Sequence, residues 1–216
     1  MARNLDRTLR RTRAHRAPAS PRPRRHGFGL VMAALIAFAL PTAEPGHSAL
    51  AGDAVSASAA PKSEREYLIK AAVLYNFAKF ARWPSDAFDG PDAPLRLCIL
   101  GTDPFGDTLA TIEDKLVNGR RLKTERITDI NEARRCHLLF VSGTAEAQLD
   151  RLFETIDGQP VLTVADMPGF ARAGGILDLT TIDDRLRFDV NTTAAERAGL
   201  KLSAKLLRLA ATVIEE

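Results

Sequence analysis

Catalytic chemistry in this chain would have to be built on very few histidine and cysteine side chains. Three of the four histidines lie within the first 51 residues: His15, His26 and His47. His137 is the only imidazole after them. A zinc site made of histidines is therefore excluded from the later part of the chain, and a site built on Cys98 and Cys136 would need carboxylates that no spacing suggests.

No nucleophile can be matched with a base. Cys136 and His137 are consecutive in an expected strand, so their side chains point to opposite faces. Ser142 is five residues from His137, about 16 Å along a strand, which is beyond hydrogen-bond reach. The carboxylates of Asp183 and Asp184 fall in an expected turn, where water solvates them. We therefore expect no catalytic residue, no metal site and no cofactor.

Two loops are candidates for a ligand crevice, because ligands of open α/β sheets bind at the carboxyl ends of strands. The candidate residues are Asp103, Phe105, Asp107, Asp166 and Phe170. The first loop lacks the G-x-G-x-x-G and Gly-Lys-Ser/Thr motifs that hold phosphates. A capped strand-to-helix turn and an exposed turn explain the same residues, so a crevice is one of two interpretations.

The elements that would position these residues alternate between helix and strand. Apolar spacing predicts a first helix that opens with a capping box of Ser63 and Glu66 and stops at Trp83 and Pro84. Its core face is expected to contain Leu68, Ile69, Ala72, Val73, Phe77, Ala78 and Phe80. Short apolar runs predict strands at 95–100, 121–127, 136–141 and 161–165. Apolar spacing predicts a further helix at 144–156, and a weaker pattern predicts one at 107–116.

The last third of the sequence predicts a hairpin and a closing helix. The hairpin strands are expected at 176–180 and 186–190. Thr193 and Glu196 form a second capping box. The closing helix is expected to present Leu202, Leu206, Leu209 and Val213 on one face. These elements predict an α/β fold: a single three-layer domain with a mainly parallel sheet and an antiparallel edge hairpin.

Arginine is concentrated at the start of the chain. The first 51 residues contain nine of the 30 basic residues, all Arg, and only two of the 27 acidic ones. The 21 basic and 25 acidic residues that follow give a formal charge of −4, although the whole chain carries +3. This balance does not support a nucleic-acid-binding surface, because phosphate binding needs clustered Lys and Arg on the folded part.

The arginine-rich start has the organisation of an export signal. The uncharged apolar stretch at 28–40 covers about 20 Å as a helix, less than the ~30 Å hydrocarbon core of a bilayer. Ala49, Leu50 and Ala51 match the small-x-small site of signal peptidase. We expect a cleaved signal peptide at 1–51, with an uncleaved anchor as the alternative. A flexible lead-in at 52–61 then precedes an α/β domain at 62–216.

Export would place the two cysteines in an oxidising compartment. Cys98 and Cys136 both fall in expected strands, and a bridge between them requires those strands to be neighbours. The alternative is a pair of buried free thiols packed as small apolar side chains.

The end of the first helix carries more aromatic surface than one core-facing stripe needs. Tyr75, Asn76, Lys79 and Trp83 recur at spacings of three and four, on a face rotated from the expected core face. Aromatic and cationic side chains are enriched in protein interfaces. These four residues are candidates for partner binding, and completion of the core by Tyr75 and Trp83 is the alternative.

The same stretch carries a family resemblance. Residues 70–84 resemble the K-A-A-x-L-Y-N-F-A-K-F-x-x-W-P signature of the YfiR family of periplasmic proteins. The resemblance continues in order through 95–101, 103–106, 136–142, 160–164, 174–175, 187–191, 198–200 and 203–209.

The resemblance implies a non-enzymatic periplasmic regulator. Such a protein binds the periplasmic sensor part of an inner-membrane diguanylate cyclase, holds it inactive and so lowers cyclic-di-GMP output. The resemblance also implies a homodimer in which the first helix takes part, and release by an outer-membrane or peptidoglycan-associated partner. A periplasmic small-ligand sensor is the alternative function, and it would need an open crevice between the two candidate loops.

Overall fold

The structure is a computed structural model, and it describes residues 62–183 and 185–215. The expected signal peptide at 1–51, the lead-in at 52–61 and Asp184 lie outside the described residues. The helices are α1 (Lys62–Phe80), α2 (Leu149–Thr155), α3 (Thr192–Arg197) and α4 (Ala204–Leu209). Short 3₁₀ helices are η1 (Ser85–Ala87), η2 (Gly106–Thr111), η3 (Ile130–Arg135) and η4 (Gly143–Gln148).

The strands form two sheets. The large sheet has the order β10-β8-β7-β6-β5-β2-β4-β3. Its strands are β2 (Leu95–Leu100), β3 (Leu116–Val117), β4 (Arg120–Ile127), β5 (Leu138–Val141), β6 (Leu162–Ala165), β7 (Leu177–Ile182), β8 (Arg185–Asn191) and β10 (Thr212–Ile214). The small sheet pairs β1 (Ala81–Arg82) with β9 (Lys201–Leu202) in antiparallel fashion.

The centre of the large sheet is parallel, as the two-sided burial of its strands requires. β4, β2, β5, β6 and β7 pair in parallel, and β7 pairs with β8 as the expected antiparallel hairpin. β10 lies outside that hairpin, parallel to β8. At the other edge β3 and β4 form a second hairpin. Asn118 and Gly119 have φ of 51° and 88° in its turn, which is why an Asn-Gly pair stands there.

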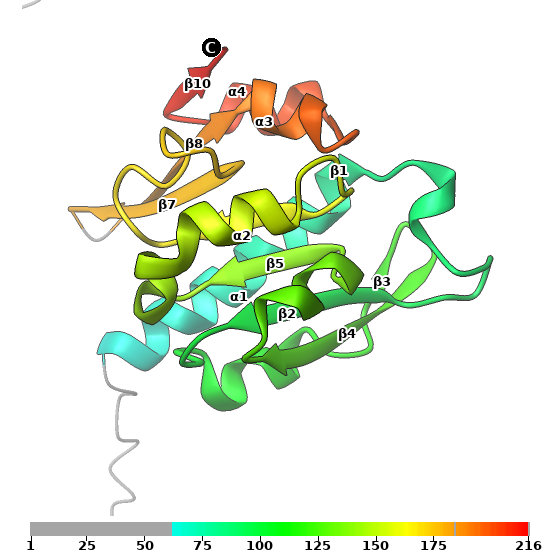
Figure 1. Cartoon of the computed structure of the whole chain (residues 1–216). Helices are drawn as coiled ribbons and strands as arrows, with labels where there is room; N and C mark the ends of the chain where they lie inside the picture. Colours follow the sequence, from blue (N-terminus) through cyan, green and yellow to red (C-terminus); the bar gives the residue numbers. More distant parts are fainter. Residues whose placement is uncertain (1–61, 184, 216) are drawn as a thin grey trace, which may run out of the picture. The chain divides into compact units, whose positions relative to one another are not determined.

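The large sheet separates two hydrophobic cores, which makes the domain three-layered (Figure 1). One core packs α1, α3 and α4 against side chains such as Leu97, Phe140 and Leu177. The other packs η3, η4 and α2 against the neighbouring side chains, among them Leu139 and Val141. The alternation follows from the period of two along a strand. The expected single α/β domain is therefore confirmed.

The first helix is rotated from the expected orientation. Its buried face contains Lys70, Ala71, Leu74, Phe77 and Ala78. The sequence pattern placed Leu68 and Ile69 in the core, and this is wrong: they are 44% and 50% exposed. The helix has apolar side chains on both faces, so spacing alone did not decide which face the sheet covers.

The end of the chain also differs from the expectation. The closing helix is only α4, of six residues, because Ala210 is already extended and 212–214 form β10. Leu209 and Val213 are consequently exposed. The helix before it is capped by Asn191, whose Oδ1 accepts the N–H of Ala194, and not by Thr193. The expected helix at 107–116 is the 3₁₀ helix η2 followed by the edge strand β3.

Candidate interaction surface

The C-terminal turns of α1 hold three of the four partner-binding candidates. Asn76 and Lys79 are exposed, and Tyr75 is half-buried. The Tyr75 hydroxyl donates to the backbone carbonyl of Leu116 on β3 at 3.0 Å. Lys79 Nζ lies 5.3 Å and Lys115 Nζ 5.7 Å from the centroid of the Tyr75 ring. Tyr75 is thus fixed at its hydroxyl and flanked by two cations.

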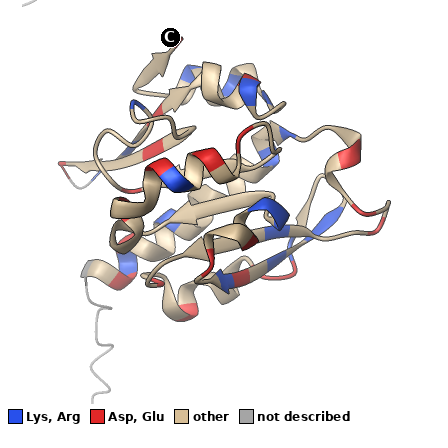
Figure 2. Cartoon of the chain, in the orientation of Figure 1, with Lys and Arg blue, Asp and Glu red and all other residues tan. Residues whose placement is uncertain are grey.

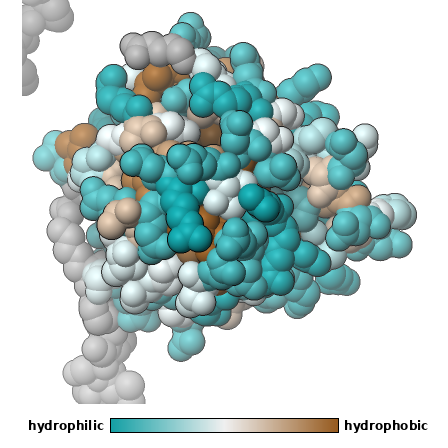
Figure 3. All heavy atoms as spheres, viewed as in Figure 1, coloured by the Kyte–Doolittle hydropathy of each residue, from teal (hydrophilic) through white to brown (hydrophobic). Residues whose placement is uncertain are grey.

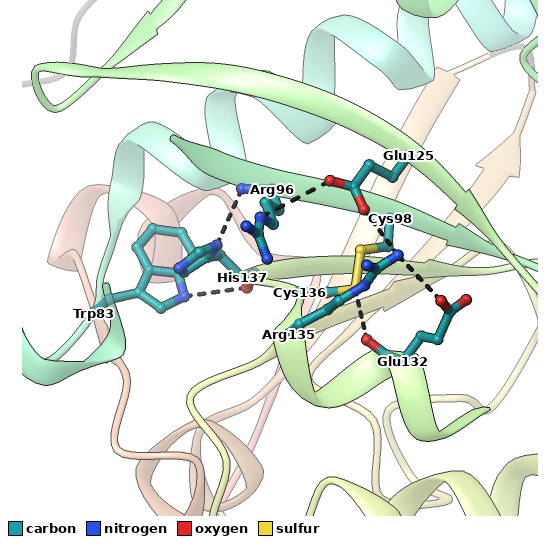
Figure 4. Close-up of a disulfide and its surroundings, with 8 residues drawn as sticks. All are labelled: Trp83, Arg96, Cys98, Glu125, Glu132, Arg135, Cys136 and His137. Atoms are coloured by element: carbon teal, nitrogen blue, oxygen red, sulfur yellow. Dashed lines mark hydrogen bonds and ion pairs between the residues drawn. A yellow bond between two sulfur atoms is a disulfide. The ribbon is translucent and has the colours of Figure 1, made fainter. Parts of the chain in front are cut away.

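Trp83 lies beyond the helix, because α1 ends at Phe80. Its indole Nε1–H donates to the backbone carbonyl of His137 at 3.1 Å (Figure 4). Its ring meets Phe88 edge-on, with the centroids 6.5 Å apart. The helical spacing that grouped Trp83 with Tyr75 in the sequence is therefore wrong, because Trp83 follows the helix and Tyr75 lies within it.

A groove of about 290 Å³ opens beside Trp83. Its floor is apolar, with the buried side chains of Leu95 and Val117. Arg82, Asn118 and Arg120 line it together with the two aromatic rings. Arg120 is held in place, because its Nη1 donates to the carbonyls of Gly90 and Ala93 at 2.9 and 2.7 Å.

Arg120 also lies over an aromatic ring, since its guanidinium carbon is 3.7 Å from the Phe88 centroid. Both hydrogen-bond acceptors of Arg120 are neutral carbonyls, so no carboxylate of the described residues forms a hydrogen bond with it. The groove is consequently aromatic, cationic and free of acidic lining residues.

The outer face of α1 is a second unusual surface. Ile69, Val73 and Phe80 follow one another at helical spacing on the side away from Leu74. Ile69 is half exposed, whereas Val73 and Phe80 are half-buried because they pack against the edge of the core that contains Leu74. The opposite side of the domain differs: Figure 3 views the α2 layer, and that face is mainly hydrophilic.

The five crevice candidates do not form one site. Phe105 is buried in the core beneath α1, where its ring meets Tyr67 and Phe140 at centroid distances of 5.2 and 4.8 Å. Phe170 is buried in the other core against Phe153. The two aromatic candidates therefore lie on opposite faces of the sheet and cannot line a shared crevice.

The three acidic crevice candidates do not line a common crevice either, because two of them are bonded to other groups of the protein and the third lies elsewhere. Asp103 accepts the N–H of Phe105 through Oδ1 at 2.8 Å and forms an ion pair with Arg126 through Oδ2. It is the cap of a turn, as the alternative interpretation held. Asp107 is exposed and lines a shallow groove with Leu68 at the start of α1. Asp166 is bound by side chains of α1.

A buried lysine of α1 occupies the carboxyl end of β6. Lys70 is 5% exposed, and its Nζ lies 2.7 Å from Asp166 Oδ2 and 2.8 Å from Glu66 Oε1. The Tyr67 hydroxyl donates to the same oxygen of Asp166 at 2.9 Å. Burial alone would lower the pKa of Lys70, but the hydrogen bonds with Asp166 and Glu66 outweigh it and raise that pKa. α1 thus closes with its own side chains the place where α/β sheets bind ligands.

The two cysteines form a disulfide, which is the first of the two alternatives for this pair. Cys98 lies in β2, and Cys136 lies two residues before β5, the neighbouring strand, with the Cα atoms 5.9 Å apart. Figure 4 shows a chain of charges beside it. Glu125 lies 3.8 Å from Arg96 and 3.1 Å from Arg135, and Arg135 also pairs with Glu132 at 3.2 Å.

The single histidine of the described residues is a structural one. The Nδ1 of His137 accepts the backbone N–H of Arg96 at 3.0 Å, so Nε2 carries the proton and donates to the carbonyl of Ala87 at 3.0 Å. The ring stacks on Phe88, with the centroids 4.3 Å apart. Burial lowers the pKa of His137, which keeps the imidazole neutral near pH 7. Both nitrogens are engaged, so His137 is not placed to act as a base.

Sequence reasoning missed two buried charges. Lys70 was overlooked although Glu66 stands four residues before it, the spacing of a helical ion pair. Asp178, 3% exposed on β7, accepts the N–H of Gly169 through Oδ2 at 2.8 Å, and its burial raises its pKa. It fixes the loop after β6. Within 62–183 and 185–215, no three His, Cys, Asp or Glu side chains gather as a metal site would require.

No helix among the described residues has the length and apolarity needed to cross a bilayer. Two solved structures show a distant likeness to this chain. A conserved domain protein from Vibrio cholerae O1 biovar El Tor is 11% identical, with a TM-score of 0.38, over 55% of this chain and 54% of that one. An ABC domain in complex with L-Trp from Streptococcus pneumoniae is 11% identical, with a TM-score of 0.40, over 55% of each chain. The chain spans about half the length of these structures.

Most of the chain matches the sequence pattern of a known protein family. Residues 67–211 match the YfiR/HmsC-like family. The matched segment runs from α1 to the residue before β10 and contains both cysteines and all four partner-binding candidates. The chain belongs to the YfiR/HmsC-like family.

Proposed function

We propose that this chain is a periplasmic regulator that binds the periplasmic sensor part of an inner-membrane diguanylate cyclase and represses it. Repression lowers cyclic-di-GMP signalling. The match of residues 67–211 to the YfiR/HmsC-like family carries the proposal. The disulfide fits an oxidising compartment, because such bonds persist mainly outside the cytosol.

Binding, and not catalysis, is the activity that the side chains support. The one histidine of the described residues is fixed between two backbone groups, and both cysteines are consumed in the disulfide. Lys70 and Asp166 neutralise each other. None of these groups is free to attack or deprotonate a substrate, as a catalytic residue must be.

The partner surface of the proposal is the C-terminal end of α1, with Tyr75, Asn76, Lys79 and Trp83. The polar ends of Tyr75 and Trp83 are anchored by hydrogen bonds to Leu116 and His137. An anchored aromatic side chain loses little rotamer entropy when a partner binds, so it is a good interface residue.

The proposal includes a homodimer formed through the outer face of α1. Leu68 and Ile69 expose about half of their surface, and Val73 continues the same apolar side of the helix. A second copy of the chain would remove the exposed apolar surface of Leu68 and Ile69 from water. Release of the cyclase by an outer-membrane or peptidoglycan-associated protein completes the proposed regulation.

A small-ligand sensor is the less favoured function. It requires an open crevice between the loops after β2 and β6, and Phe105 and Phe170 lie in opposite cores instead.

Co-purification tests the proposed partner. The protein lacking residues 1–51 should retain the periplasmic sensor domain of one inner-membrane diguanylate cyclase of the same cell. A Lys79→Glu variant should retain less, because Lys79 is exposed on the proposed surface. An Arg151→Glu variant on the exposed side of α2 is the matched control. Failure to retain any such sensor domain would contradict the proposal.

A further inference from the structure

Basic side chains without ion-pair partners gather around the C-terminal end of α1. We name them the basic rim: Lys79, Arg82, Lys115, Lys201 and Lys205. All five are exposed, and none forms a salt bridge with another residue of 62–183 or 185–215. In Figure 2 blue segments mark β1 and the neighbouring region of α3 and α4.

Four elements, α1, β1, β9 and α4, and the residue before β3 bring the basic rim together. Arg82 and Lys201 are paired residues of the β1–β9 sheet, so their side chains are neighbours. Lys205 at the start of α4 lies 5.2 Å from the centroid of Phe80, the last residue of α1. Lys79 and Lys115 approach the ring of Tyr75 from α1 and from the segment before β3.

No acidic side chain in the described part of the domain forms a salt bridge with the basic rim. Glu196 of α3 lines a groove together with Lys201, but the two form no salt bridge. Lys123 and Arg126 have acidic partners within 4 Å, whereas Arg151 and Arg172 form no salt bridge with another described residue. The rim therefore differs in gathering five such unpaired cations around one helix end, and not in the absence of ion pairs alone. A cluster of like charges is mutually repulsive, and an approaching anion relieves that repulsion.

The groove beside Trp83 adjoins the basic rim and gives this surface a concave part. Arg82 belongs both to the basic rim and to the groove lining, and the apolar floor of Leu95 and Val117 lies below it. A concave groove of about 290 Å³ accepts one large apolar side chain. A flat lipid surface would leave it unfilled, so the shape favours a protein segment.

We infer that the basic rim and the groove beside Trp83 bind an acidic protein segment that carries one aromatic or large aliphatic anchor residue. The carboxylates of the segment contact the rim, and its anchor lies beside Trp83 over the apolar floor of Leu95 and Val117. This inference rests on the proposed function, because it assigns the chemistry of the partner segment that meets the end of α1.

Peptide binding tests the inference without any cyclase. The probe is a fluorescent acidic peptide with a central Phe, compared with one in which Ala replaces Phe and one in which Lys replaces the acids. The Phe peptide should bind most tightly, the Ala peptide more weakly and the Lys peptide not at all. Binding of the Phe peptide should weaken as salt rises, because screening acts on exposed charges.

Two charge-matched variants localise the binding. Lys79→Glu with Lys201→Glu should weaken binding of the Phe peptide by about tenfold or more, since two attractive charges become repulsive. Arg151→Glu with Arg172→Glu changes two exposed arginines outside the rim by the same net charge and should change binding less than about twofold. Both variants should melt like the wild type, because all four positions are exposed.

Other outcomes overturn the inference. An equal loss of peptide affinity in the two double variants would refute the role of the basic rim. Equal affinity for the Phe and Ala peptides would refute the role of the groove. Binding to vesicles of phosphatidylglycerol without binding to the Phe peptide would assign the surface to a membrane instead. The peptide assay contains no cyclase, so a failure of the Phe peptide to bind refutes this inference but does not affect the co-purification test of the proposed function. In the same way, a failed co-purification refutes the proposed function but not the binding of an acidic segment.

Discussion

Replacement of Lys70 by Met should strongly destabilise the domain. Lys70 and Asp166 form a contact whose side chains are 6% and 13% exposed, with 2.7 Å between nitrogen and oxygen. Removal of one partner of a buried ion pair costs about 3–5 kcal/mol of unfolding free energy, because the other charge stays buried without a counter-ion. The Tyr67 hydroxyl continues to donate to Asp166, so we expect the lower part of that range, about 3 kcal/mol.

Urea unfolding of the protein lacking residues 1–51 measures this cost. Lys79→Met is the matched control, because Lys79 is an exposed lysine of the same helix, and it should change stability by less than about 0.5 kcal/mol. A double-mutant cycle with Asp166→Asn should show that the two substitutions are coupled. A Lys70→Met loss below about 1 kcal/mol, or additive losses in the cycle, would refute the assigned role of the pair.

The pH dependence of the unfolding free energy is a second test of the Lys70–Asp166 pair. The pKa of Lys70 is raised in the folded state, since the hydrogen bonds with Asp166 and Glu66 outweigh its burial. The stability that the charged Lys70 contributes is therefore fully present below the ordinary lysine pKa of about 10.4, and it is lost as pH rises through the pKa of Lys70 in the folded state. The wild type should lose stability above about pH 10 more steeply than Lys70→Met. Equal slopes would contradict the raised pKa.

Four further predictions concern other parts of the domain. Cys98→Ala with Cys136→Ala should lower the unfolding free energy by about 4 kcal/mol, from the 38-residue separation of the bridge, and chemical denaturation would measure the loss. Because the pKa of His137 is lowered in the folded state, protonation of His137 does not destabilise the domain above about pH 6.5. Below that pH the unfolding free energy should fall by up to about 1.4 kcal/mol per pH unit. A His137→Gln variant should lack this part of the decline in a pH series of melting curves. Ile69→Glu should shift sedimentation from dimer to monomer while leaving the melting temperature nearly unchanged, because Ile69 is half exposed. Gly101→Ala should destabilise the domain in thermal melts, since a Cβ there would lie 2.7 Å from Thr144 Oγ1 and φ is +91°.

Much of the fold could be predicted from local patterns. The continuous apolar runs that became β2, β5 and β6 admit few alternatives, and the Asn118-Gly119 pair marks the tight turn between β3 and β4. The orientation of α1 could not be predicted in this way. Ile69 and Val73 repeat as regularly as Leu74 and Phe77, and only the position of the sheet decides which pair is covered.

The positions of the candidate residues were predicted in part. Tyr75, Asn76 and Lys79 stand on the helix end that their spacing indicated, but Trp83 lies past the helix because the chain becomes extended after Phe80. The crevice was wrong because a loop position does not reveal the face to which its aromatic side chain turns, and Phe105 and Phe170 turn into opposite cores. The basic rim joins residues far apart in the sequence, so tertiary structure alone brings them together.

Cyclic-di-GMP measured in cells is the most direct test of the central claim. Deletion of the gene should raise cyclic-di-GMP, and the full-length chain supplied in trans should lower it again. The chain without residues 1–51 should leave the level high, because the proposed repression takes place in the periplasm and those residues are expected to direct export. An unchanged cyclic-di-GMP level after deletion, in cells whose diguanylate cyclases are active, would contradict the account.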